Sequence, residues 1–190
     1  ADDEIILRPI YDDIKPFSEG LAAIQLNDKW GFVNKLGGII VSPQYLHVEN
    51  FAYGYAKVQK GAKDGFIDKT GEIVIPIRYD FVSSFDENES ALVKKDGKYG
   101  YINKNGDEII PTKYNYAKFF SEGLASVCLA GRWGVIDVTG KTIISFKYDD
   151  VGYFSENRAT VLLDYKWGYV DKSANEVIPL IYDEADAFIN

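Results

Sequence analysis

Short apolar stretches alternate with polar turn sequences along the whole chain. Residues 21–26 form an apolar stretch of strand length, and the Asn27-Asp28 pair that follows is typical of a tight turn. Residues 30–33 are aromatic and β-branched, as strands prefer. Residues 34–37 predict a second turn closed by a glycine, and 38–41 predict a third strand. The pattern predicts three short antiparallel strands joined by tight turns.

The segment between these strand groups has a different spacing. Tyr11, Ile14 and Phe17 are three residues apart, which matches neither strand alternation nor a long helix. An Asp or Asn follows the tyrosine in most copies of this segment, and such residues cap turns. We therefore expect an irregular connector whose apolar side fills the gap between strand groups.

The whole pattern repeats with a period of 34 residues, and once of 35. One residue recurs without change, at Gly31, Gly65, Gly100, Gly134 and Gly168. A tyrosine recurs fourteen residues after each, at Tyr45, Tyr79, Tyr114, Tyr148 and Tyr182. The predicted organisation is a single repeat domain over 1–190, with a partial copy at 5–20 and repeats at 21–54, 55–89, 90–123, 124–157 and 158–190. Such units cannot bury their own apolar faces, so neighbours must stack.

The motif around each glycine resembles that of a known family. Lys29-Trp30-Gly31, Arg132-Trp133-Gly134 and Lys166-Trp167-Gly168 resemble the core of the WG repeat, and the similarity extends over nearly the whole chain. Asp64 and Ala174 depart from it, because other copies have an aromatic residue and a glycine there. The resemblance implies a mainly bacterial, non-enzymatic tandem β-repeat module, often found in surface or exported proteins.

The predicted fold class is all-β, with about three strands per repeat plus a connector, in an open twisted array. A five-bladed, propeller-like closed ring is the alternative. Propeller blades usually take about 40–50 residues, which is longer than this repeat. The two ends also carry the same segment, 7–17 and 178–188, whereas ring closure by strand exchange needs complementary ends. Small-angle scattering distinguishes the two, because only a closed ring gives a compact globular radius.

Charge and composition exclude several classes of function. The chain carries 21 Lys and Arg against 29 Asp and Glu, a formal net charge of −8. This acidity argues against nucleic acid as a partner and against a polybasic membrane contact. No apolar run is long enough for a membrane span, so we expect no membrane insertion. A single cysteine excludes an intramolecular disulfide.

Candidate catalytic chemistry is sparse. His47 is the only histidine and occupies a position that varies freely between repeats, so we expect it to be exposed. Cys128 lies in a predicted strand without a basic neighbour that would activate a thiol. A recurring acid at Glu19, Glu87, Glu122 and Glu156 is interpreted as a structural or solvated feature, and the sequence leaves open whether this glutamate ladder pairs with the basic row Lys29, Lys63, Lys98, Arg132 and Lys166. We predict no catalytic residues, no cofactor and no metal.

Aromatic residues are abundant, with 14 Tyr, 11 Phe and 3 Trp. Most occupy repeat positions and are predicted to form the stacking core. The structural repeat residues are Trp30, Gly31, Gly65, Tyr99, Gly100, Trp133, Gly134, Trp167 and Gly168. Five further aromatics fall in the connectors, where repeat proteins commonly bind partners. These candidate partner-binding residues are Tyr53, Phe81, Tyr116, Phe119 and Tyr153.

These observations predict a non-enzymatic repeat module that binds protein or peptide partners. A glycan-binding or cell-wall-binding module is the alternative, since connector aromatics beside acids also suit sugars. The sequence begins at Ala1 and contains no Met, which fits either a mature chain after removal of a signal segment or a part of a longer protein. The first reading and the family resemblance favour an exported or cell-envelope location in a bacterium.

Overall fold

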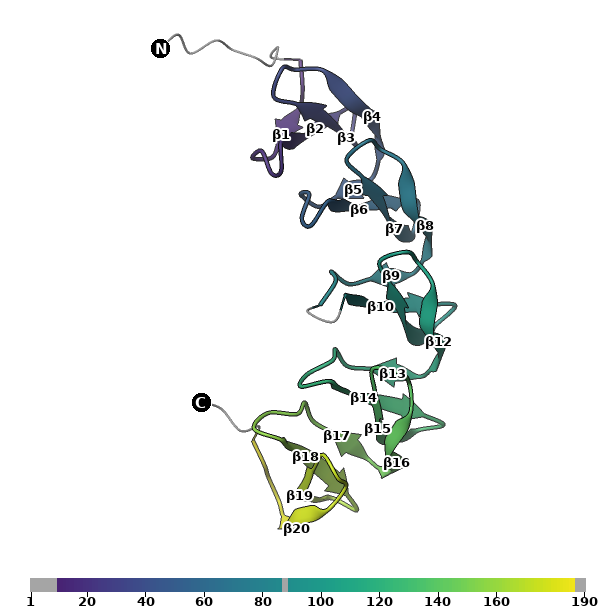
Figure 1. The fold of residues 1–190 in the computed structure, drawn as a ribbon, viewed down its shortest axis with the longest axis vertical. Helices are drawn as coiled ribbons and strands as arrows, with labels where there is room; N and C mark the ends of the chain where they lie inside the picture. Colours follow the sequence, from purple (N-terminus) through teal and green to yellow (C-terminus); the bar gives the residue numbers. More distant parts are fainter. Residues whose placement is uncertain (1–9, 87–88, 187–190) are drawn as a thin grey trace. The chain divides into compact units, whose positions relative to one another are not determined.

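A computed structural model describes residues 10–86 and 89–186. These residues form twenty strands in five four-stranded sheets and contain no helix (Figure 1). Strands that are consecutive in the chain are neighbours in each sheet, as in the order β1-β2-β3-β4, so every sheet is a meander. Each sheet has two edges, and none closes into a barrel.

The strands fall into four classes by position in the sheet. The first strands have two residues each and are β1 (Asp13–Ile14), β5 (His47–Val48), β9 (Phe81–Val82), β13 (Tyr116–Ala117) and β17 (Asp150–Val151). The second strands are β2 (Leu21–Leu26), β6 (Tyr55–Lys60), β10 (Ser90–Lys95), β14 (Leu124–Leu129) and β18 (Arg158–Leu163). The third strands are β3 (Lys29–Asn34), β7 (Lys63–Asp68), β11 (Lys98–Asn103), β15 (Arg132–Asp137) and β19 (Lys166–Asp171). The fourth strands are β4 (Ile39–Tyr45), β8 (Ile73–Tyr79), β12 (Glu108–Tyr114), β16 (Thr142–Tyr148) and β20 (Glu176–Tyr182).

This arrangement confirms the predicted all-β fold of tandem antiparallel repeats. The three expected strands per repeat are present. The connector, expected to be irregular, contributes a short fourth strand in addition. Each sheet begins in the connector, so the sheet of β5–β8 takes its first strand from the end of the segment 21–54.

The invariant glycine lies where the third and fourth strands press together. The register between β11 and β12 shifts on both sides of Tyr101, so residues 111–113 bulge across Gly100. A Cβ added to Gly100 would lie 2.6 Å from the carbonyl oxygen of Ile110 and 2.8 Å from the Cα of Thr112. Equivalent backbone atoms lie 2.6–2.7 Å from the Cβ that Gly65, Gly134 or Gly168 would carry. Glycine is required because no side chain fits beneath the bulged strand.

A tight turn joins the connector to the second strand. Ser18 and Leu21 exchange backbone hydrogen bonds, and the two residues between them have φ angles of 50° and 91°. Positive φ at both central positions defines a type I′ turn, which suits the twist of a hairpin. The same turn occurs around Tyr53, Glu122 and Glu156, whose φ angles are 53°, 51° and 52°.

The chain divides into two compact units. One comprises residues up to Val82 together with Lys104–Gly106, and the other comprises Ser83–Asn103 and the residues from Asp107 onward. In the first unit, the sheets of β1–β4 and β5–β8 share one apolar core. Val48 and Phe51, from the connector, are 0% and 2% exposed within it, so the connector fills the gap between sheets as expected.

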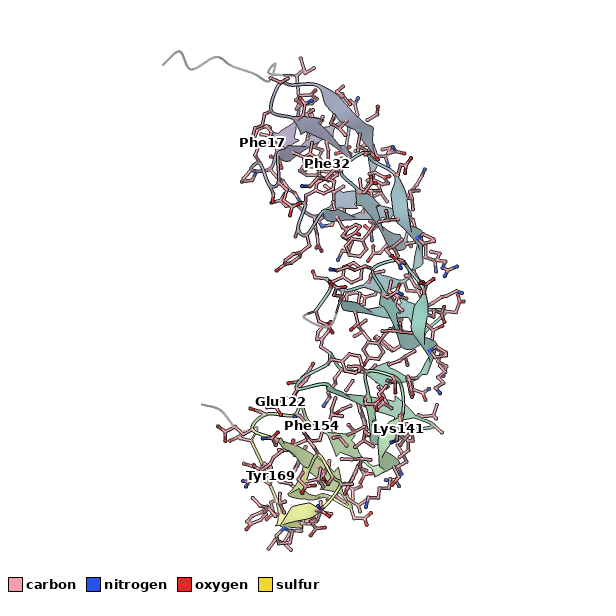
Figure 2. The ribbon with its side chains drawn as sticks, viewed as in Figure 1. Phe17, Phe32, Glu122, Lys141, Phe154 and Tyr169 are labelled. Carbon is pink, nitrogen blue, oxygen red and sulfur yellow. The ribbon has the colours of Figure 1, made fainter. Side chains whose placement is uncertain are left out.

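The second unit repeats this packing. Its core contains Tyr148 at the end of β16, and Val151 and Phe154 from the segment between β16 and β18, in contact with apolar residues of the sheets on either side. Phe154 is 2% exposed and is labelled in Figure 2. Ser121 Oγ donates a hydrogen bond to the Phe154 carbonyl at 2.7 Å, and Ser18 Oγ makes the same bond to Phe51 at 2.6 Å in the first unit.

The turn between β19 and β20 supports a stability prediction. Ala174 has a φ of 65°, whereas the equivalent glycines at 37, 71, 106 and 140 have φ of 77–89°. We expect Ala174→Gly to change the free energy of unfolding by between zero and about +1 kcal/mol, because glycine adopts positive φ without steric cost. Urea denaturation measures this change. A clear loss of stability would contradict the shared turn geometry.

Candidate functional site: an aromatic ladder

The five aromatic residues predicted to bind a partner differ in exposure. Tyr53 is 82% exposed, Tyr116 61%, Phe119 48% and Tyr153 46%. Phe81 is half-buried. The structure brings Tyr116 and Tyr153 together around Trp133 and Lys118, all within the second unit.

Tyr116 is the middle member of a series of three stacked rings, Tyr99, Tyr116 and Trp133, which we call the aromatic ladder. The Tyr99 and Tyr116 ring centroids are 6.3 Å apart with an interplanar angle of 27°. Those of Tyr116 and Trp133 are 6.4 Å apart at 18°. Tyr99 and Trp133 are half-buried, so part of each of their side chains is accessible to solvent.

Strand register explains why these side chains share a face. Tyr116 on β13 pairs with Cys128 on β14, and Cys128 pairs with Trp133 on β15. Residues directly opposite in antiparallel strands point to the same side of the sheet. Cys128, on the central strand of these three, is 4% exposed and lies on the same side of the sheet as Tyr116 and Trp133.

Lys118 extends the ladder to Tyr153. Its ammonium lies 4.9 Å from the Trp133 ring centroid and 5.7 Å from that of Tyr153. The same ammonium donates to the Val151 carbonyl at 2.6 Å and pairs with Asp150 at 3.2 Å. These contacts fix Lys118 between the two rings. At the other end, Lys94 lies 5.2 Å from the Tyr99 ring centroid.

The other three candidates lie outside this cluster. Phe81 has the Lys57 ammonium 5.9 Å from its ring centroid, and Lys57 pairs with Glu49 at 2.6 Å. Tyr53 projects from a type I′ turn of the first unit. Phe119 lies next to Phe120, whose ring packs on Tyr101 at 4.6 Å.

Sequence reasoning missed two members of the ladder. Tyr99 and Trp133 occupy the repeat position of Trp30 and were assigned with it to the stacking core. Trp30 is indeed buried, at 8% exposure, whereas Tyr99, Trp133 and Trp167 are only half-buried. The residue in the sequence that could have indicated the ladder is Tyr116. An aromatic residue at this place in the connector can stack on Tyr99 and Trp133, which occupy the repeat position of Trp30.

The recurring glutamates link neighbouring repeats. Glu19 accepts a hydrogen bond from the Gly54 N–H at 3.0 Å, in the equivalent turn of the next repeat, and pairs with Lys69 at 2.9 Å. Glu122 forms the same links to the Asn157 N–H and to Lys172, both at 3.0 Å. The lysine hydrogen bond is the main cause that lowers the pKa of each carboxyl, and the turn N–H adds to it. Glu87 lies outside the described residues.

Three members of the basic row pair with another acid of the repeat. Lys63, Arg132 and Lys166 pair with the aspartate that follows the repeat tyrosine, at Asp80, Asp149 and Asp183. Glu19 and Glu122 lie in the turns before the second strands, where their partners are Lys69 and Lys172. Asp149 also accepts a hydrogen bond from the Asp164 N–H at 2.9 Å, so it caps a hairpin turn as expected.

The remaining candidates for chemistry are accounted for by their surroundings. His47 is exposed, as predicted, and Cys128 is buried in β14. Within residues 10–86 and 89–186, no group of three or more His, Cys, Asp or Glu side chains could hold a metal ion. The same residues include no helix with the length and apolar character of a membrane span.

Asp64 is a buried carboxyl at the position that Trp30 occupies in the preceding repeat. It is 8% exposed, and burial raises its pKa above the ordinary value of 3.8. Lys57, the Val82 backbone and Gln59 partly oppose this rise. A carboxyl with a raised folded-state pKa favours folding only at low pH, and this contribution is lost as pH rises through the folded-state pKa.

We expect Asp64→Asn to be more stable than the wild type at pH 7, by up to about 2–4 °C in Tm, the shift that about 1 kcal/mol produces in a domain of this size. The advantage shrinks as the pH falls towards 4, because Asp64 then protonates in both folded and unfolded states. Thermal unfolding at pH 4, 5, 6 and 7 measures the difference. A difference that grows as the pH falls would contradict the raised pKa.

The fold and its exposed ladder define an all-β tandem-repeat protein with an aromatic surface. The profile of the WG-containing repeat matches six consecutive segments, 2–30, 30–63, 65–99, 99–133, 133–167 and 167–190. The chain belongs to the WG-containing repeat family. Membership of a tandem-repeat family suggests a binding module.

Several solved structures align with this chain at low similarity. Hsv2 of Kluyveromyces lactis aligns over 87% of this chain with 8% identity and a TM-score of 0.47, and the chain spans only 62% of that protein. A eukaryotic initiation factor aligns over 92% of this chain and 67% of its own length, with 12% identity and a TM-score of 0.48. PorZ of Porphyromonas gingivalis, described as a bacterial surface component of the type-IX secretion system, aligns over 97% of this chain and 28% of its own, with 11% identity and a TM-score of 0.43. At these values the similarities carry no functional argument. No curated protein matches the chain.

Proposed function

We propose that this chain is a non-enzymatic module that binds protein or peptide partners through the aromatic ladder and the adjoining Tyr153. The observation that supports this function is the convergence of Tyr116 and Tyr153 on Trp133 and Lys118 at an exposed face. Exposed Tyr and Trp side chains anchor protein partners, because they bury a large area with little loss of side-chain entropy.

The geometry favours a peptide over a sugar. A sugar stacks on an open ring face, whereas the Tyr116 ring has two aromatic neighbours, Tyr99 and Trp133, with centroids 6.3 and 6.4 Å away. The ladder offers three adjacent rings with a lysine at each end. Three adjacent rings can contact successive residues along a peptide.

Selection from a random peptide library displayed on phage tests the proposal. We expect enriched peptides whose binding falls at least tenfold in Tyr116→Ser and is unchanged in Tyr165→Ser. Tyr165 is the matched control, because it is 92% exposed but lies in a hairpin turn and makes no ring contact among the described residues. Peptides that bind both variants equally would reject the ladder as the site. Binding to a glycan array that is lost in Tyr116→Ser would replace the proposal with a glycan-binding function.

A further inference from the structure

The turn between β11 and β12 differs in sequence from the equivalent turns of the other sheets. Asn105 precedes Gly106, the residue of this turn that has a positive φ, of 82°. The residues at the position of Asn105 in the other four turns are Leu36, Thr70, Thr139 and Ser173. An Asn-Gly pair occurs nowhere else in the chain, and Asn105 is exposed.

The same turn also differs in its backbone hydrogen bonds. In the other four turns, the residue with positive φ donates its N–H to the carbonyl oxygen three residues earlier, at 2.9–3.0 Å. These donors are Gly37, Gly71, Gly140 and Ala174. The Gly106 N–H makes no hydrogen bond within the described part of the chain. No acceptor therefore holds the Gly106 nitrogen in place.

An exposed asparagine beside an unrestrained backbone nitrogen can react with its own chain. The Gly106 nitrogen follows the Asn105 carbonyl carbon, so its attack on the Asn105 side-chain carbonyl carbon closes a five-membered ring. Glycine favours this attack, because it has no Cβ to hinder the nitrogen and its backbone rotates freely. Asparagine is for this reason one of the thermolabile residue types.

We propose that Asn105 is a site of spontaneous deamidation. Hydroxide removes the proton from the Gly106 nitrogen, which attacks the Asn105 side-chain carbonyl carbon and forms a C–N bond. The side-chain nitrogen takes a proton from water and leaves as ammonia, which regenerates hydroxide and leaves a cyclic imide. Water then opens the imide at either of its carbonyl carbons and gives aspartate or isoaspartate. The net reaction consumes one water molecule and releases one ammonia molecule.

The reaction changes both the charge and the length of the turn. A carboxylate replaces a neutral amide, so the net charge becomes more negative by one. Isoaspartate also lengthens the backbone by one carbon atom. Gly106 packs closely on β8 within the first unit, because a Cβ added to it would lie 3.3 Å from Ile75 Cδ1 and 3.7 Å from Pro76 Cδ. The lengthened turn has little room on that side.

Asn103 provides a matched reference two residues away. Its Oδ1 accepts a hydrogen bond from the Asp107 N–H at 2.9 Å, and its Nδ2 donates to Asp107 Oδ2 at 3.0 Å. These bonds hold the side-chain amide of Asn103 away from the backbone nitrogen of Lys104. The Cβ of Lys104 also hinders that nitrogen. We therefore expect Asn103 to remain asparagine while Asn105 reacts.

Peptide mapping by mass spectrometry tests the inference on the whole chain, incubated in mildly alkaline buffer. We expect Asn105 to convert before any other asparagine, and at least tenfold faster than Asn103. Asn105→Thr, which copies Thr70, should abolish the more acidic form that anion-exchange chromatography separates from the wild type. Gly106→Ala should slow the conversion at least tenfold, and the alanine at 174 shows that this turn accepts the residue. Circular dichroism confirms that both variants are folded.

Incubation in concentrated urea separates the effect of the turn from that of the Asn-Gly pair alone. Because the folded turn leaves the Gly106 nitrogen unrestrained, we expect Asn105 in the folded protein to convert within tenfold of its rate in urea. A folded rate more than tenfold below the rate in urea would show that the turn protects Asn105 and would overturn the inference. Equal rates at Asn105 and Asn103 in the folded protein, or an unchanged rate in Gly106→Ala, would also overturn it.

Discussion

Replacing Gly100 by alanine should destabilise the protein by about 3 kcal/mol or more, at the upper end of the cost of overpacking. The added Cβ would lie 2.6 Å from the Ile110 carbonyl oxygen and 2.8 Å from two further backbone atoms of β12. Backbone cannot rotate away as a side chain can, so β11 and β12 must separate. Urea denaturation, monitored by tryptophan fluorescence, measures the loss in the free energy of unfolding.

Gly38→Ala provides the matched control for this change. A Cβ on Gly38 would meet only the Asn34 side chain, at 3.1 Å, and Gly38 is exposed. We expect a change within about 1 kcal/mol, as for most surface substitutions. Equal losses at Gly100 and Gly38 would mean that the bulged strand does not press on the invariant glycine.

Phe154→Ala should cost about 3–5 kcal/mol, the usual range for truncating a buried phenylalanine. Phe154 is 2% exposed and packs among apolar residues of two successive sheets in the second unit. Its loss opens a cavity among the apolar residues that the two sheets bring together. Thermal and urea denaturation both report the effect.

Phe17 occupies the same repeat position as Phe154 but is 44% exposed, and both are labelled in Figure 2. We expect Phe17→Ala to cost about 1 kcal/mol or less, because less apolar area is lost from the core. The comparison holds residue type and repeat position constant and varies burial. Similar losses at the two positions would show that the connector phenylalanine acts within its own repeat and not between repeats.

The repeat itself could be predicted because its signals are local. The turn residues, the glycine period and the strand-length apolar stretches each depend on a few neighbouring positions. The two-residue strands, such as β13, could not be predicted, because a strand this short shows no alternation of apolar and polar residues. They form only because a longer strand, such as β14, offers them an edge.

The sequence predicted two residues of the candidate site and missed the others. Position in the connector indicated that Tyr116 and Tyr153 are exposed, and both are. The sequence could not show that Trp133 is less buried than Trp30, because the two occupy the same repeat position and differ only in what covers them. The sequence did not indicate Lys118 either, because the two rings that it contacts, those of Trp133 and Tyr153, are 15 and 35 residues further along the chain.

The links made by Glu19 and Glu122 reach the turn before the second strand of the next four-stranded sheet and a lysine of that same sheet. A duplication of one complete repeat, cut at the same point of the repeat, therefore places an equivalent sheet after each of these two glutamates. The number of repeats can therefore change during evolution by whole repeats, while exposed residues such as Tyr116 diverge independently in each repeat.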